Sequence, residues 1–109
     1  MLASNPYFNT QAEFMANVGH FPNLRVHRSM SHDFATSVDS PVEVDMVFID
    51  GGHSRDVALQ DMRDWWPRCR KVFCGHDAWM EGVKEALNEF SRDGWRMAVG
   101  EIWTIEVQK

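Results

Sequence analysis

Four side chains with the chemistry of a metal or acid–base site follow two apolar segments of the sequence. Asp50 ends the first segment and His53 comes three residues later, while His76 and Asp77 follow the second segment. Carboxylate oxygens favour Mg²⁺ or Mn²⁺, and imidazole nitrogens widen the choice of cation. A histidine beside such a site can instead accept a proton at neutral pH, as a general base does.

Each of these residues also has a purely structural interpretation. An aspartate after a strand commonly caps a helix or forms a turn, and His53 could be a solvated loop residue. His76 and Asp77 could form a local pair that caps the following helix. Their joint position favours a site only if both segments are neighbouring parallel strands, whose carboxyl ends share one edge of the sheet.

The two apolar segments have the features of buried strands. Residues 44–49 contain a continuous apolar run, which predicts a central parallel strand that is buried on both faces. Residues 71–74 predict a second, shorter strand. Gly51 and Gly52 follow the first strand, where they permit a tight turn and the close approach of a ligand to the backbone.

The remaining segments alternate between helical and extended patterns. Helices are predicted at about 10–18, where Thr10 and Glu13 fit a capping box, in a short segment capped by Ser31, from Ser54 to about Trp66, and at about 80–92. Further strands are predicted at 24–28, 95–99 and 102–107, the last two joined by a hairpin at Gly100-Glu101. This order predicts an α/β domain: a mostly parallel sheet with helices on both faces and a C-terminal antiparallel hairpin.

Composition limits the class of protein. A chain of 109 residues is long enough for one domain, 1–109, and its net charge of −5 argues against nucleic acid as the main partner. No apolar run is long enough to cross a bilayer and the start does not resemble a signal peptide, so we expect a cytoplasmic protein with no membrane partner. Cys74 lies in an apolar run and is expected to be a buried thiol.

Other polar residues are assigned to the surface. Asp61, Arg63, Asp64 and Arg68 are expected to form the solvated face of a helix, and His20 and His27 are also expected on the surface.

Several segments together resemble a known family. They are Asp45-Met-Val-Phe-Ile-Asp-Gly-Gly-His-Ser54, Asp61-Met-Arg-Asp-Trp65, Gly75-His-Asp77 and Gly82-Val-Lys-Glu-Ala86. They are similar to small class I methyltransferases that use S-adenosylmethionine, in particular the subgroup with "IDG-x-H" after the fourth strand and "GHD" after the fifth. The similarity spans about residues 8–92 and is strongest from 45 to 86.

The resemblance implies roles for individual residues. Asp50 and Asp77 match positions that bind Mg²⁺ in metal-dependent O-methyltransferases, and His76 adjoins the metal position as a ligand or as a neighbour of one. His53 matches a histidine proposed to deprotonate the acceptor hydroxyl. Ser29, Met30 and Ser31 fall where the family contacts the adenine ring, and Gly51 and Gly52 are also assigned to the cofactor.

The sequence departs from the family at its start. The glycine-rich loop after the first strand and the acidic residue after the second are not found, so the sequence predicts a truncated Rossmann-like fold without the first two strands. We expect weak binding of S-adenosylmethionine by this chain alone. Strands that lack their neighbours leave unpaired edges, which predicts a homo-oligomer formed through a sheet edge or a tryptophan-rich face.

Three functions are therefore considered. The first is metal-assisted methyl transfer from S-adenosylmethionine to the hydroxyl of a small-molecule substrate. The second is a non-catalytic binding or assembly module that keeps the rear half of the fold. The third is a small metal-dependent hydrolase or lyase that uses the same strand ends.

Overall fold

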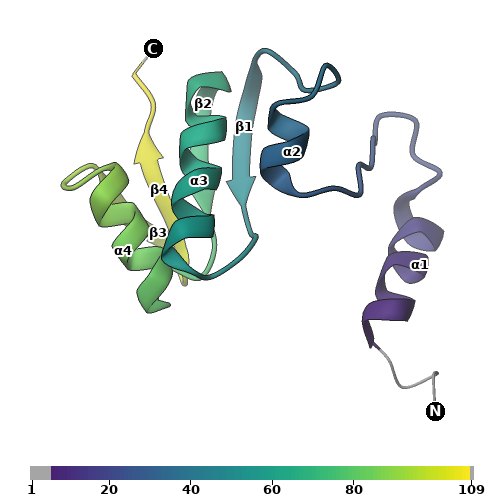
Figure 1. Cartoon of the computed structure of the whole chain (residues 1–109), viewed down its shortest axis with the longest axis horizontal. Coiled ribbons are helices and arrows are strands. Elements are labelled where there is room, and N and C mark those ends of the chain that lie inside the picture. The colour runs from purple at the N-terminus through teal and green to yellow at the C-terminus, as the bar shows by residue number, and fades with distance from the viewer. Residues whose placement is uncertain (1–5, 109) are drawn as a thin grey trace.

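The computed structural model describes residues 6–108 (Figure 1). The helices are α1 (Pro6–Val18), α2 (Ser31–Ala35), α3 (Arg55–Trp65), the 3-10 turn η2 (Trp66–Arg68) and α4 (Glu81–Phe90). The strands are β1 (Val44–Ile49), β2 (Cys69–Gly75), β3 (Trp95–Val99) and β4 (Ile102–Glu106). None of the helices in this part of the chain is long and apolar enough to cross a membrane.

The strands form one sheet in the order β1-β2-β4-β3. The pair β1–β2 is parallel, whereas β4 is antiparallel to both β2 and β3. The expected mostly parallel pairing is therefore not confirmed, although β3 runs in the same direction as β1 and β2. The predicted C-terminal hairpin is confirmed, and Gly100 adopts φ 56° at its turn, a backbone conformation that glycine tolerates without strain.

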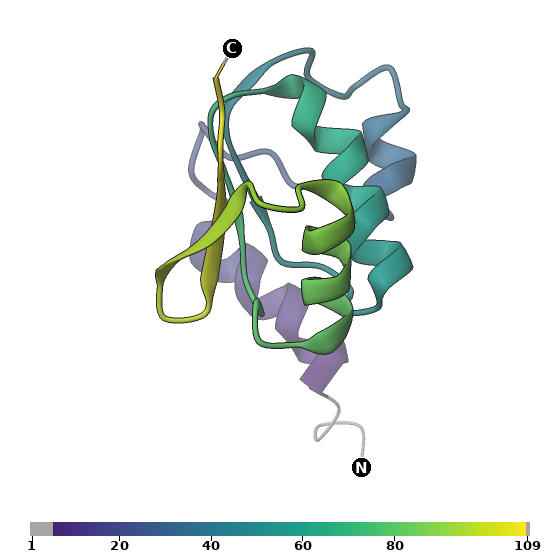
Figure 2. The ribbon, with the colours of Figure 1, turned by 90° about the vertical axis from the view of Figure 1, so that its left-hand side faces the viewer.

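The core lies on one face of this sheet, beneath α3 and α4 (Figure 2). Val47 and Phe73 point from the two parallel strands toward Met62 of α3 and Leu87 of α4, and all four are buried. Trp103 closes the core from β4 and is only 1% exposed. The prediction of helices on both faces is wrong for the described residues, because α3 and α4 pack side by side on the same face.

The opposite face of β1 is not covered by any described element. Met46 is 56% exposed and Phe48 is 47% exposed, and within β1 only Val47 is buried. The expectation that this strand is buried on both faces is therefore wrong. The physical reason is that α3 and α4 pack only on the face that carries Val47; β1 also lies at the edge of the sheet, with β2 as its single described neighbour.

The N-terminal region also differs from expectation. Residues 24–28 form no strand, and the side chains of Leu24 and Val26 are 38% and 42% exposed. Their alternating pattern does not produce a strand because no described strand lies beside them to share hydrogen bonds. Helix α1 begins at Pro6, so Thr10 lies inside it and is not its cap; the helix stands apart from the sheet, beyond α2 (Figure 1).

The start of α3 forms as the sequence predicts. The hydroxyl of Ser54 accepts a hydrogen bond from the backbone nitrogen of Val57 at 3.3 Å, which satisfies a donor in the first turn. The predicted cap at Ser31 is wrong, because Met30 occupies that position and Ser31 is the first residue of α2. The hydroxyl of Ser31 instead accepts a hydrogen bond from Nε1 of Trp65 at 3.0 Å.

Candidate functional site

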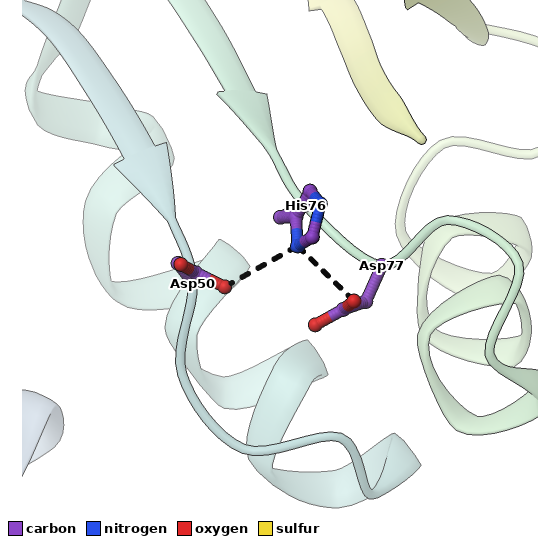
Figure 3. Close-up of side chains that lie close together, drawn as sticks. All are labelled: Asp50, His76 and Asp77. Atoms are coloured by element: carbon purple, nitrogen blue, oxygen red, sulfur yellow. Dashed lines mark ion pairs between the residues drawn. The ribbon is translucent and has the colours of Figure 1, made fainter. Parts of the chain in front are cut away.

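The parallel pairing of β1 and β2 brings their carboxyl ends together. Ile49 is in register with Gly75, and the backbone nitrogen of His76 donates to the carbonyl oxygen of Ile49 at 3.0 Å. Asp50 and His76 therefore leave the sheet side by side (Figure 3). The two strands are thus neighbours, as a shared site for their terminal residues requires.

The imidazole of His76 lies between two carboxylates. Its Nδ1 is 3.7 Å from Oδ1 of Asp50 and 3.1 Å from Oδ1 of Asp77 (Figure 3). One ligand atom from each of the three residues lies within 4.8 Å of the other two. Ligands of a six-coordinate cation bound at about 2.1 Å are separated by about 3.0 to about 4.2 Å. The three groups could thus hold a divalent cation after a small adjustment of their side chains.

Asp77 occupies an unusual backbone conformation at the centre of this cluster. Its φ of 61° is the positive value of the left-handed region, which residues other than glycine adopt at an energetic cost. Its side chain is 15% exposed, and its two oxygens approach different histidines: Oδ1 faces His76, and Oδ2 lies 2.8 Å from Nε2 of His53. The turn therefore aims this carboxylate at both imidazoles.

The loop that carries His53 is packed against the start of α4. A Cβ atom placed on Gly82 would collide with the carbonyl oxygen of His53 and would lie 2.9 Å from the backbone nitrogen of Arg55. Only a glycine permits this approach. The side chain of His53 remains 51% exposed and so is accessible to a ligand.

Glu101 is a member of the site that the sequence did not indicate. Its Oε2 lies 3.3 Å from Nε2 of His76, on the ring edge opposite to Asp50 and Asp77. Glu101 belongs to the hairpin turn before β4, and its position in the sequence shows nothing beyond a turn. Only the pairing of β4 with β2 brings it to His76.

Two adjoining cavities lie next to the cluster. The first has a volume of about 300 Å³, is lined by Ser29, Ser31 and Gly51 among others, and also includes Asp50. The second, of about 470 Å³, adds Met30 and Gly52. The five residues expected to contact a cofactor therefore lie together around these cavities, and Asp50 belongs both to the first cavity and to the cluster.

Asp61 lies where the two cavities meet, and its predicted position on a solvated face is wrong. The residue is 6% exposed. Burial raises the pKa of its carboxyl above the usual 3.8; a hydrogen bond from Ser31 lowers this pKa and the nearby charge of Asp64 raises it. Oδ2 of Asp61 also lies close to Gly51: a Cβ atom placed on Gly51 would be 3.0 Å from this oxygen.

Two other members of that expected helix face make contacts with α2. Oδ2 of Asp64 lies 2.9 Å from Nδ1 of His32. The guanidinium of Arg68 donates to the carbonyl oxygen of Ala35 at 2.6 Å. Polar residues of this face therefore attach α2 to α3 through Asp64 and to η2 through Arg68. Arg63 remains exposed, as expected.

Residues outside the site follow the sequence predictions more closely. Cys74 is a buried thiol, as expected, and burial raises its pKa. His20 and His27 are exposed, although His27 also lines the first cavity. Trp103 fills the core, whereas Trp79, two residues after Asp77, is 57% exposed.

The fold and the site together define an α/β domain with a ligand crevice and an acidic–histidine cluster at the carboxyl ends of parallel strands. A family described as a methyltransferase domain matches residues 3–78, and the chain belongs to this family. The match covers β1, β2 and the cluster of Asp50, His76 and Asp77, and it ends before α4 and the hairpin. No curated protein and no solved structure matches the chain.

Proposed function

We propose that this methyltransferase domain transfers a methyl group from S-adenosylmethionine to the hydroxyl of a small molecule, with a divalent cation at Asp50, His76 and Asp77. Methyltransferase domains generally use this donor, and the family assignment supports it. The observation that carries the proposal is the position of Asp50, which lines the cavity and also faces Nδ1 of His76. A ligand in that cavity would lie beside the cation.

The cavities suit a ligand with both polar and apolar parts. Their volumes, about 300 and about 470 Å³, fall within the range of about 300–1,000 Å³ typical of small-molecule sites. Ser29 and Ser31 provide hydroxyls, Gly51 allows close approach to the backbone, and Asp61 provides a buried carboxylate. These groups would hold the adenosine part of the donor.

The donor set also fits the proposed cation. Two carboxylates and one imidazole are suitable ligands for a hard or borderline divalent ion, and their atoms lie within 4.8 Å of one another, so a small adjustment would bring them to the required separation. A cation bound here would supply a Lewis acid that lowers the pKa of the acceptor hydroxyl and orients it. Asp50, His76 and Asp77 would hold that ion.

His53 is the proposed general base. Nε2 of His53 lies 2.8 Å from Oδ2 of Asp77, to which it would donate its N–H, and Nδ1 is then left to accept a proton. In the transfer, the acceptor oxygen forms a bond to the methyl carbon, the bond from carbon to sulfur breaks, and sulfur keeps the electron pair. The hydroxyl proton passes to His53 and then to water.

Calorimetry with S-adenosylmethionine, with and without Mg²⁺, tests the proposal. We expect binding that is strengthened by Mg²⁺ and weakened by Asp50→Asn and by Asp77→Asn. Asp45→Asn is the matched control, because Asp45 is an exposed aspartate in β1, the strand that leads to Asp50. Cation binding without binding of the donor would instead support a metal-dependent hydrolase or lyase.

An assembly module is the second candidate, and the uncovered face of β1 favours it. Met46 and Phe48 expose apolar surface there, next to a strand edge that no described residue pairs with. Such an edge is a template for pairing with another chain, including a second copy. Sedimentation should then show a homo-oligomer that Met46→Lys dissociates, and a monomer at micromolar concentration would contradict this candidate.

A further inference from the structure

Glu101 lies against the cluster from the side that the family similarity does not cover. The match ends at residue 78, whereas Glu101 belongs to the turn between β3 and β4. Its carboxylate lies 3.3 Å from Nε2 of His76.

The ring of His76 has its two nitrogens directed at different partners. Nδ1 faces Asp50 at 3.7 Å and Asp77 at 3.1 Å, and Nε2 faces the carboxylate of Glu101. An imidazole that gives one N–H to a carboxylate keeps the lone pair on its other nitrogen, and metal-binding histidines commonly have such a partner. The arrangement leaves Nδ1 as the nitrogen that faces the two proposed carboxylate ligands.

The backbone of Glu101 is held in this position by contacts of the turn itself and of β4. Its carbonyl oxygen accepts a hydrogen bond from the backbone nitrogen of Ala78 at 3.2 Å. Two residues later, Nε1 of Trp103 donates to the carbonyl oxygen of His76, also at 3.2 Å. The turn is thus attached to the segment that carries His76 and Asp77, and the side chain of Glu101 needs only to span a short distance.

The exposure of Glu101 and His76 indicates that Glu101 acts mainly by orienting the imidazole ring and less through its charge. Its side chain is 51% exposed and that of His76 is 37% exposed. An ion pair so open to water contributes little to stability. Fixing the plane and the proton-bearing nitrogen of the ring, however, directly changes how well Nδ1 can serve as a ligand.

We propose that Glu101 is a positioning residue that presents Nδ1 of His76 as a direct metal ligand, so that the centre prefers a transition-metal cation over Mg²⁺. This inference rests on the cation centre of the proposed function and deepens it. Mg²⁺ usually binds through one or two carboxylates and several waters, and an imidazole adds little to its affinity. Imidazole adds more to cations such as Co²⁺, Ni²⁺ and Zn²⁺.

The test is a titration of the 109-residue chain with Co²⁺, whose visible absorption responds to a nitrogen ligand, together with competition by Mg²⁺. We expect tighter binding of Co²⁺ than of Mg²⁺ in the unchanged protein. Glu101→Ala should lower the affinity for Co²⁺ by about 10- to 100-fold, the usual effect of removing such a partner, and should lower the affinity for Mg²⁺ less. Glu101→Gln should restore part of the Co²⁺ affinity, because the amide oxygen can still accept the N–H.

Glu106→Ala is the matched control, because Glu106 is an exposed glutamate at the other end of β4 and its loss changes the net charge equally. Its Co²⁺ affinity should stay within about twofold of the unchanged protein. Circular dichroism of each variant checks that the hairpin remains folded, and Glu101→Gln, nearly identical in shape, retains the test if Glu101→Ala unfolds.

Three results would overturn the inference. They are an equal loss of affinity for Co²⁺ and Mg²⁺ in Glu101→Ala, no loss of affinity for either cation, and no binding of Co²⁺ by the unchanged protein. Failure of the proposed function has a different signature: Co²⁺ binds and depends on Glu101, but S-adenosylmethionine does not bind with any cation present. In that case the inference about Glu101 stands and the methyl-transfer proposal does not.

Discussion

The indole nitrogen of Trp103 donates a hydrogen bond to the carbonyl oxygen of His76, 3.2 Å away. Trp103 is 1% exposed and belongs to the core, whereas His76 lies at the centre of the candidate site. The same tryptophan is in register with Gly75 on the neighbouring strand. The packing of β4, the last of the described strands, therefore helps to determine where His76 is placed.

This packing predicts that Gly75→Ala destabilises the protein. A Cβ atom at this position would collide with the ring of Trp103 and would lie 2.6 Å from the carbonyl oxygen of Ile49. A buried indole and a backbone carbonyl cannot move without disturbing the sheet, so we expect the free energy of unfolding to fall by about 1–3 kcal/mol. Urea denaturation monitored by tryptophan fluorescence measures the change.

Gly100→Asn is the control for this substitution. Nothing lies within 4 Å of a Cβ atom on Gly100, and asparagine tolerates its φ of 56° better than other side chains do. We expect a loss of less than about 1 kcal/mol. Equal losses at Gly75 and Gly100 would show that close packing against Trp103 is not the cause.

The backbone of Asp77 predicts that stability and metal binding can be separated. Its φ of 61° is tolerated by asparagine and glycine but disfavoured for a β-branched residue. Asp77→Val should therefore lower the free energy of unfolding by about 1–3 kcal/mol, more than Asp77→Asn or Asp77→Gly. All three should lose Co²⁺ binding in calorimetry, because each lacks the carboxylate, and retention of binding by Asp77→Asn would contradict the assigned ligand.

Local sequence signals were sufficient where a feature depends on nearby residues. The apolar run at 44–49 gave β1 with its observed bounds, and Ser54 was identified as the cap of α3. Two neighbouring parallel strands must place their carboxyl ends at one edge, so the approach of Asp50 to His76 was expected if these strands pair, and they do. The helix predicted at about 80–92 is likewise present as α4, at Glu81–Phe90.

Features that depend on distant partners could not be predicted in this way. Asp61 was assigned to the surface because its own helix is polar there, yet Ser31 and Gly51 enclose it. Glu101 had no partner in its neighbourhood of the sequence, since its contact with His76 arises from the pairing of β4 with β2. The alternating pattern at 24–28 predicted a strand, but a strand also needs a neighbour to supply its hydrogen bonds.

Burial of both cysteines predicts slow reaction with thiol reagents. Cys69 is 0% exposed and Cys74 is 5% exposed, and burial raises the pKa of the Cys74 thiol, which reduces its reactive thiolate fraction. At neutral pH we expect modification more than ~100-fold slower than in the urea-unfolded chain, an opening free energy above about 2.8 kcal/mol. Rapid labelling of either thiol without denaturant would show that this part of the core opens readily.

The buried carboxyl of Asp61 predicts a pH dependence of stability. Burial, the largest effect, raises its pKa in the folded protein above the usual 3.8, so the folded state binds the proton more tightly than the unfolded state does. The resulting contribution to stability is fully present below the unfolded value. It is lost as the pH rises through the folded-state pKa, because the carboxylate must then be ionised within the protein.

Comparison of variants isolates this contribution. Asp61→Asn cannot ionise, so the free energy of unfolding of the unchanged protein should fall relative to this variant as the pH rises from the usual 3.8 through the raised folded-state pKa of Asp61. Ser31→Ala removes the hydrogen bond that lowers the pKa, which should shift the loss to higher pH. Asp56→Asn is the control on the same helix, since the side chain of Asp56 is 90% exposed. The difference in free energy of unfolding between this variant and the unchanged protein should not show the same dependence on pH. A constant difference for Asp61→Asn across the range would mean that ionisation of Asp61 costs the fold nothing.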